Sequence, residues 1–368
     1  MKTETITYLN DAIEIMVECF KFNYQNADNA IQLFTPMING GVGKGKSQSV
    51  VTVHDIMAEW MVSIGKIKLK NDYGLIYLDA PQLDATEVNG WFIPSEDKQS
   101  MTRLRPPHCP KDGYGIIFID EMSQAPQSVQ NVLGQLLLER RLGEHKLGEG
   151  WQIVVASNRQ KDRAGTTHMP TQIRDRLKPW LNVDNSLEDI VLHFSKKNVN
   201  SKIISWMKFT QGKWIQDNAF NRDANSNPTP RSIEVCGTIL DMKIKDHLKQ
   251  NMLDGTIGVE ASTDLIGFIK YYDRLPNIDE VIKDPMNSVM VEHGQLAYIM
   301  TTELSKRSNK NTFGNIADYM LRMYREQSSA ELVALFVKEC LARDGTLKTH
   351  PKMREMFGSN SPFQHLLK

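Results

Sequence analysis

A glycine-rich octapeptide near the start of the chain carries the residue types that bind phosphate. Its residues are Gly40, Gly41, Val42, Gly43, Lys44, Gly45, Lys46 and Ser47, and they match the Walker A pattern G-x-x-x-x-G-K-[ST] in full. Glycines let backbone N–H groups curl around phosphate oxygens, where a Cβ would obstruct them. The pattern therefore predicts ATP binding, with Lys46 on the β- and γ-phosphates and Ser47 on Mg²⁺. Lys44 stands at a variable position, and the pattern assigns it no role.

An acidic pair follows an apolar run farther along the chain. Residues 116–119 are Ile-Ile-Phe-Ile, and Asp120 and Glu121 come directly after them. This is the form of a Walker B strand, in which Asp120 holds Mg²⁺ and Glu121 polarises the attacking water as a general base. Apolar strands often end in acidic residues, so the Walker A match upstream is what makes the pair informative. The adjacent glutamate favours hydrolysis of ATP over phosphoryl transfer to a separate acceptor.

Asn158 follows a third apolar run, residues 153–156. A polar side chain there can lie between the γ-phosphate and the attacking water, and so sense which nucleotide is bound. Asn is also favoured as a helix N-cap and in Asx-turns, which is the alternative interpretation. The two Walker patterns favour the sensing role.

Three arginines are candidates for contacting the γ-phosphate. Arg174 and Arg176 lie within residues 172–177, and Arg231 follows Pro230. An arginine placed against a neighbouring subunit's γ-phosphate stabilises transition-state charge, whereas the alternative for Arg174 and Arg176 is a solvated helix end. Because proline fixes a helix start, Arg231 is expected on a rigid first turn, where the helix dipole disfavours a cation. That misfit favours a role in reading phosphate charge.

Two adjacent aromatic residues, Trp91 and Phe92, follow Asn89 and Gly90 in a predicted loop. In a ring-shaped ATPase such a loop can face the axial pore and grip a polymer. Aromatic pairs also pack into local cores. The local core is the favoured interpretation, with the pore loop as the alternative.

The elements that must position these residues form an alternating pattern. Apolar spacing predicts an N-terminal helix around residues 13–20 and a helix of about five turns after Ser47. Strands are predicted over residues 31–38, 75–78, 115–119 and 151–156. Strands that alternate with helices indicate an α/β protein with a parallel, doubly wound sheet. From about residue 186 helical periods dominate, which predicts all-helical material.

The composition limits the class of protein. Among 368 residues, Lys plus Arg and Asp plus Glu number 44 each, so the formal net charge is zero. That balance gives no global sign of nucleic-acid or anionic-membrane binding, although an oligomer could still form a basic channel. The N-terminus lacks a signal-peptide core, and no stretch approaches the roughly 18 apolar residues of a membrane span. A cytoplasmic protein without membrane contact is expected.

The cysteines are Cys19, Cys109, Cys236 and Cys340, and no two of them form a C-x-x-C pair. Neither a zinc site nor a disulfide framework is therefore predicted. His108 precedes Cys109, but no second ligand pair has matching spacing, so both are interpreted as loop residues. A reducing compartment is expected.

Taken in order, these patterns resemble the AAA+ family and, within it, the MoxR branch. The likeness extends over nearly the whole chain, with Val42 where proline is frequent and Leu177 where Phe is usual. The matching stretches are residues 40–47 (Walker A), 116–126 (Walker B with its trailing Ala-Pro), 127–151 (the helix and hairpin after it), 156–159 and 162–165 (sensor 1 and its loop), 169–177 (arginine finger), 227–232 (sensor 2), and 268–276 and 296–304 (the C-terminal part of a bacterial and phage subgroup).

The resemblance implies an AAA+ P-loop core with a five-stranded parallel sheet, a helical lid and a C-terminal helical region. The implied domains are residues 1–185 for the N-terminal helix and core, 186–255 for the lid with sensor 2, and 256–368 for the C-terminal region. It implies that ATP and Mg²⁺ bind between subunits of a homo-oligomeric, hexameric ring. It places the finger at Arg176, with Arg174 as the alternative.

MoxR-like proteins commonly act as remodelling chaperones, often with a partner that carries a von Willebrand factor A domain. The favoured hypothesis is therefore an ATP-driven remodeller of a protein target, with that partner as a separate protein. One alternative is a nucleic-acid motor or loader of the same superfamily, which would need a basic pore. The other is a scaffold gated by nucleotide binding without significant turnover. The combination of Asp120, Glu121, Asn158 and the arginines argues against the scaffold.

Overall fold

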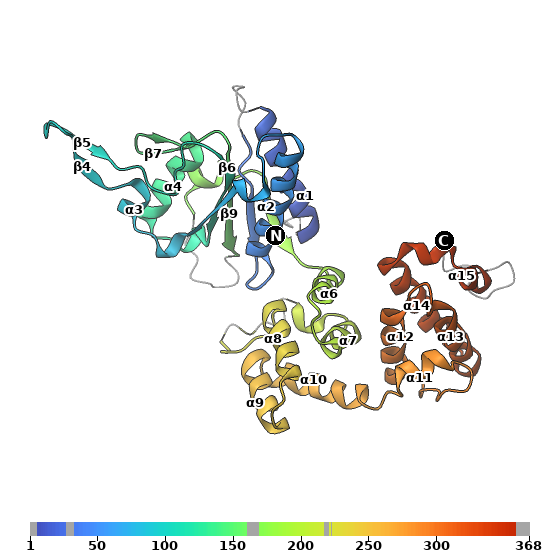
Figure 1. The fold of residues 1–368 in the computed structure, drawn as a ribbon. Coiled ribbons are helices and arrows are strands. Elements are labelled where there is room, and N and C mark those ends of the chain that lie inside the picture. The colour runs from blue at the N-terminus through green and yellow to red at the C-terminus, as the bar shows by residue number, and fades with distance from the viewer. Residues whose placement is uncertain (1–5, 27–32, 160–168, 217–220, 222, 358–368) are drawn as a thin grey trace. The chain divides into compact units, whose positions relative to one another are not determined.

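The computed structural model describes residues 6–26, 33–159, 169–216, 221 and 223–357. The chain divides into two compact units, unit 1 with residues 1–190 and unit 2 with residues 191–368 (Figure 1). The division lies within helix α6 (Leu187–Lys196), close to the domain boundary expected after residue 185. The boundary expected after residue 255 lies inside unit 2.

Unit 1 is built on a six-stranded sheet in which every neighbouring pair is parallel. The strands lie in the order β1 (Ile6–Tyr8), β10 (Trp180–Asp184), β2 (Met37–Gly40), β9 (Trp151–Asn158), β6 (Tyr114–Asp120) and β3 (Tyr73–Asp79). The parallel α/β sheet predicted from the sequence is thus confirmed. Its five expected strands run from β10 to β3, and the short β1 adds a sixth beside β10.

The strand that leads into the glycine-rich loop begins later than its apolar pattern predicts. The prediction covers residues 31–38, whereas β2 begins at Met37. Thr35 makes only an isolated bridge, and Pro36 has no N–H to donate to a ladder. The regular strand therefore starts after the proline; residues 31 and 32 lie outside the described part of the chain.

Alternate side chains of the sheet enter two hydrophobic cores, one on each face. Along β6, Ile116 and Phe118 join the core that contains α1 (Leu9–Gln25) and α2 (Lys46–Ser63), which are the two predicted helices. Ile117 and Ile119 join the core of α4 (Gln127–Glu139) and the short α5 (Thr171–Arg174). Helices on both faces explain why these strands are continuous apolar runs.

Two small antiparallel hairpins interrupt the parallel core. After helix α3 (Ala85–Asn89), β4 (Phe92–Pro94) pairs with β5 (Met101–Arg103), and this arm extends away from the sheet (Figure 1). The second hairpin pairs β7 (Arg141–Leu142) with β8 (His145–Lys146).

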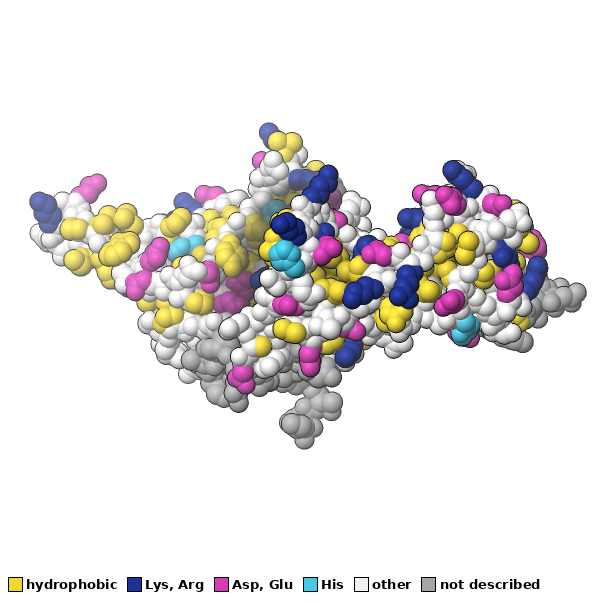
Figure 2. All heavy atoms as spheres, turned by 90° about the horizontal axis from the view of Figure 1, so that it is seen from below, with side chains coloured by type: hydrophobic (Ala, Val, Ile, Leu, Met, Phe, Trp, Pro, Cys, Tyr) yellow, Lys and Arg dark blue, Asp and Glu magenta, His cyan; other side chains and the backbone are white. Residues whose placement is uncertain are grey.

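Hydrophobic side chains gather on the arm that carries β4 and β5 (Figure 2). Trp91 is 63% exposed and Phe92 is 53% exposed. The interpretation of these two aromatics as local core is therefore wrong. Gly90, with φ 88°, is followed directly by the hairpin of β4 and β5, so these side chains lie on the arm.

Unit 2 is all-helical in its described part, as the periodicity from residue 186 onward predicts. Its helices after α6 are α7 (Ser201–Phe209), α8 (Pro230–Asp241), α9 (Asp246–Ile257), α10 (Val259–Tyr272), α11 (Ile278–Lys283), α12 (Gln295–Arg307), α13 (Phe313–Gln327), α14 (Ala330–Arg343) and α15 (Pro351–Met356). Helices α11 to α15 share one core, in which the rings of Phe313 and Phe336 stack with centroids 5.7 Å apart.

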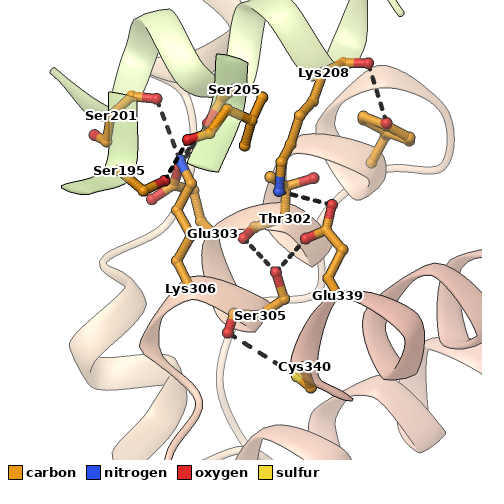
Figure 3. Close-up of polar contacts among 12 residues, drawn as sticks. Ser195, Ser201, Ser205, Lys208, Thr302, Glu303, Ser305, Lys306, Glu339 and Cys340 are labelled. Atoms are coloured by element: carbon orange, nitrogen blue, oxygen red, sulfur yellow. Dashed lines mark hydrogen bonds and ion pairs between the residues drawn. The ribbon is translucent and has the colours of Figure 1, made fainter. Parts of the chain in front are cut away.

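Helix α7 is joined to α12 and α14 by polar contacts of buried and half-buried charged groups (Figure 3). Lys208 Nζ lies 2.9 Å from Glu339 Oε1. Lys306 Nζ lies 2.7 Å from Glu303 Oε1, which also accepts a hydrogen bond from Ser205. Since buried charges are tolerated only when paired, these contacts tie α7 specifically to the C-terminal helices.

The remaining global features concern the membrane and the thiols. Across the described residues, no helix has both the length and the hydropathy that crossing a bilayer requires. All four cysteines are buried as free thiols.

Candidate phosphate-binding site

The glycine-rich loop connects the end of β2 to the start of α2, as its pattern predicts. Gly43 has φ 71° and Gly45 has φ 83°, a left-handed conformation that favours glycine. Gly40 faces another constraint, because a Cβ there would lie 2.6 Å from Val183 Cγ2. The loop therefore needs glycine for its turns and for its close approach to β10. It ends at a helix N-terminus, which attracts anions.

The Lys46 ammonium lies against the loop. Lys46 Nζ donates to the carbonyl oxygens of Gly40 and Gly41, both at 2.9 Å, and to Asn158 Oδ1 at 2.7 Å. The parallel pairing of Gly40 with Asn158 brings the ends of β2 and β9 together. Strand register thus places the lysine of one motif beside the asparagine of another.

A hydroxyl and a carboxylate form the candidate metal site. Ser47 Oγ, in the first turn of α2, donates to Asp120 Oδ2 at the end of β6, at 2.9 Å. Serine and aspartate oxygens suit Mg²⁺, which commonly takes one or two protein ligands together with phosphate oxygens and water. The described residues contain no cluster of three or more His, Cys, Asp or Glu side chains that could cage a metal by themselves. The donor set therefore fits Mg²⁺ bound together with a nucleotide.

Tyr77 was not singled out by the sequence, but it belongs to this group. Its hydroxyl donates to the same Asp120 oxygen as Ser47, at 3.2 Å. Burial, followed by the Asp120 charge, raises the pKa of Tyr77 to about 12. Asp79 pairs with Asp120 across β3 and β6, and that register brings Tyr77 into reach. Only strand pairing could have identified it.

Glu121 occupies an unusual backbone position beside Asp120. Its φ is 55°, which is uncommon for a residue with a side chain and is often found at functional sites. Asn158 Nδ2 lies 2.7 Å from each carboxylate oxygen, and Gln124 donates to one of them. Burial is the main cause that raises the pKa of Glu121; Lys46 opposes it and Asp120 adds to it. A raised pKa makes the carboxylate a stronger base.

The side-chain amide of Asn158 therefore bridges two groups of opposite charge. Its oxygen accepts from Lys46 and its nitrogen donates to Glu121, and the reverse orientation would oppose both contacts. The interpretation of Asn158 as a simple N-cap does not account for this bridge.

The other residues of the loop differ from Lys46 in their exposure and contacts. Val42 is 40% exposed. Lys44 is buried and pairs with Asp184 at 2.9 Å. A Cβ on Gly41 would lie 2.7 Å from an Arg159 guanidinium nitrogen, so a further cation lies beside the loop. Position next to Asn158 is the sequence signal that could have identified Arg159.

The candidate finger arginines donate hydrogen bonds to residues outside this cluster. Arg176 is half-buried, and its guanidinium donates to the carbonyl of Gly134 on α4 at 3.1 Å. Arg174 is exposed and donates to Thr171 at 3.2 Å. The loop expected at residues 162–165 lies outside the described residues.

Arg231 belongs to unit 2, on the first turn of α8. Pro230 begins the helix, and Thr229 and Ser232 cap each other's backbone N–H groups, at 3.2 and 2.8 Å. Arg231 itself is exposed. The predicted rigid helix start is confirmed.

One edge of the sheet thus gathers a phosphate loop, an ammonium, a hydroxyl–carboxylate pair and the Glu121 carboxylate, whose pKa burial raises. These groups come from the carboxyl ends of β2, β6 and β9, where open parallel sheets bind ligands. Together they can bind the phosphates of a nucleotide with Mg²⁺ and activate a water molecule.

Comparisons with known proteins do not assign a function to this site. No protein-family model and no curated protein matches the chain. Among solved structures, a RuvB mutant from Thermotoga maritima aligns at 13% identity and a TM-score of 0.38, over 86% of this chain and 90% of that one. NtrX from Brucella abortus in complex with ADP aligns at 14% identity and a TM-score of 0.39, over 95% and 69%. Similarity at this level transfers no function.

Proposed function

We propose that the chain is an ATPase that binds Mg²⁺–ATP at residues 40–47 and hydrolyses it with Glu121 as the general base. The observation that carries this proposal is the Asn158 bridge, because it joins the phosphate-loop lysine to the acidic residue after the Walker B strand. Asp120 and Ser47 lie beside that bridge with oxygens suited to a metal.

Each group has one task in this reaction. Lys46 and the loop N–H groups bind the phosphates. Ser47 and Asp120 would hold Mg²⁺, which would offset negative charge on the phosphate oxygens. Glu121 accepts a proton from the water that attacks the γ-phosphorus. The bond between that phosphorus and the bridging oxygen breaks, and ADP and phosphate are released.

The direct test compares two substitutions in the cluster. Glu121→Gln is expected to retain nucleotide binding and to lower turnover by about a hundredfold or more, whereas Lys46→Ala is expected to weaken binding itself. Glu87→Gln, an exposed glutamate on α3, is the matched control. ATP hydrolysis at the wild-type rate by Glu121→Gln would rule out Glu121 as the base.

We further propose that the chain works as a homo-oligomeric, hexameric ring, with Arg176 completing the site of a neighbouring subunit and Arg231 reading the phosphate from the lid. In support, Arg176 is anchored to α4 and not to its own chain's phosphate cluster. Arg174 is the alternative finger. Mixing Lys46→Ala subunits with Arg176→Ala subunits should restore turnover, because the mixed interfaces combine an intact loop with an intact arginine.

Failure of the mixture to recover would speak against a shared site, and Arg174→Ala in place of Arg176→Ala separates the two candidates. Light scattering of Glu121→Gln with ATP measures the ring size directly.

The work done by the ring is proposed to be remodelling of a protein target, with a separate partner carrying a von Willebrand factor A domain. The supporting feature is the exposed apolar arm at Trp91 and Phe92. Its base is held rigidly, since Arg103 donates through its N–H to Glu144 at 2.9 Å and its carbonyl bonds His145 at 2.8 Å.

A nucleic-acid motor is the second candidate, because the Arg103 guanidinium lies 4.4 Å from the Phe92 ring centroid on the same arm. Aromatic and cationic groups together can stack bases. Stimulation of turnover by unfolded polypeptide supports remodelling, and salt-sensitive stimulation by single-stranded DNA or RNA supports the motor.

A further inference from the structure

The phosphate loop carries a second lysine, Lys44, whose side chain is only 9% exposed. Its ammonium lies 2.9 Å from Asp184 Oδ1. A buried cation in a phosphate loop could be neutralised by the ligand, but this one already has a carboxylate partner from the protein. Because Asp184 already balances the charge of Lys44, this lysine does not need a phosphate to do so. Its role therefore differs from that of Lys46.

Asn185, which follows Asp184 in the chain, binds the backbone of Lys44. Asn185 Nδ2 donates to the Lys44 carbonyl oxygen at 2.9 Å, and the Asn185 N–H donates to Asp184 Oδ1 at 2.9 Å. Two consecutive residues thus bind both the side chain and the backbone of one loop residue. Such a contact restrains the loop at the turn just before Gly45.

Asp184 and Asn185, which bind Lys44, lie close to the end of unit 1 along the chain. Asp184 ends β10, whose Val183 pairs with Gly40 at the start of the loop. The chain then enters α6, and residues 184–190 form the connector that ends unit 1. The contacts of Lys44 therefore connect the loop to the segment that leads along the chain into unit 2.

We infer that Lys44 is a positioning residue that couples the nucleotide state of the phosphate loop to the connector, residues 184–190, through Asp184 and Asn185. The inference rests on the proposed function, since it requires nucleotide to bind at the loop. It assigns to Lys44 the mechanical link between the site and the connector, and no direct contact with phosphate.

A double-substitution cycle separates this role from direct phosphate binding. If Lys44 bound phosphate, Lys44→Met would weaken ADP binding, while Asp184→Asn would strengthen it by removing a competing negative charge. If Lys44 is a positioning residue, both changes break the same contact. They should then have effects of equal sign, of about threefold to tenfold on ADP affinity, and the double variant should be no worse than either one.

The measurements are titration with a fluorescent ADP analogue and amide hydrogen exchange with and without ADP. In the wild-type protein ADP should slow exchange in the loop and in residues 184–190. In Lys44→Met, Asp184→Asn and the double variant the loop should still respond, while the response of the connector should fall severalfold; the bond from Asn185 to the backbone carbonyl of residue 44 remains in all three. Lys44→Arg should restore the response, and Lys66→Met, an exposed lysine after α2, should leave it intact.

Three results would overturn the inference. One is a wild-type connector that shows no change in exchange with ADP while the loop responds, and another is a connector response that is undiminished in Lys44→Met. The third is opposite signs for Lys44→Met and Asp184→Asn. Absence of nucleotide binding by the wild-type protein would instead overturn the proposed function, and this inference with it.

Discussion

The side-chain nitrogen of Asn158 lies 2.7 Å from both carboxylate oxygens of Glu121, while its oxygen accepts from Lys46. One amide thereby positions the proposed base and the proposed phosphate-binding lysine together. The bridge joins the ends of β9, β6 and the P-loop, which lie far apart in the sequence. Substitutions around it should therefore affect chemistry more than folding.

Replacing Asn158 by Ala should lower ATP turnover by about tenfold to a hundredfold, because Glu121 loses the donor that orients it. ADP affinity should change far less, since the loop and Lys46 remain. The measurement is steady-state turnover beside equilibrium ADP binding. Asn131→Ala, on the exposed face of α4, is the control. Equal losses in turnover and in affinity would contradict the orienting role.

Replacing Glu121 by Gln should stabilise unit 1 at neutral and alkaline pH. Burial raises the pKa of Glu121, so its ionised form is disfavoured in the folded protein. This cost is fully present above the raised folded-state pKa and vanishes as pH falls below the ordinary glutamate value. Urea unfolding at several pH values should show a gain for the variant that disappears in acid. A gain independent of pH would contradict this explanation.

Replacing Tyr77 by Phe should weaken the effect of Mg²⁺ on nucleotide binding. The hydroxyl donates to the Asp120 oxygen that also accepts from Ser47, so its loss frees that carboxylate to reorient. ADP affinity with Mg²⁺ should fall by about twofold to tenfold, while affinity in EDTA stays unchanged. Tyr271→Phe, an exposed tyrosine in unit 2, is the control. Equal effects with and without Mg²⁺ would place Tyr77 outside the metal site.

Replacing Lys208 by Met should destabilise unit 2 by about 1 to 3 kcal/mol, because it leaves the half-buried Glu339 carboxylate without its cation (Figure 3). The double variant Lys208→Met, Glu339→Leu removes both charges and should recover most of that loss. Urea unfolding followed by tryptophan fluorescence measures both. A double variant as unstable as the sum of the single changes would show that the pair is not coupled.

The amino-acid sequence by itself determined the chemistry of the loop and the type of most elements. Gly43 and Gly45 are needed for local backbone reasons, and a strand and a helix flank residues 40–47 as predicted. The parallel sheet followed from apolar runs that alternate with helical periods. These features depend on near neighbours in the chain, which is why a single sequence reveals them.

Tertiary structure decided which of these groups meet. Tyr77 reaches Asp120 because β3 pairs with β6, and Asp184 reaches Lys44 because β10 pairs with β2. The exposure of Trp91 likewise depends on a hairpin whose apolar residues resemble core residues in the sequence. Strand order and register are settled by the packing of both cores at once, and no local pattern contains that information.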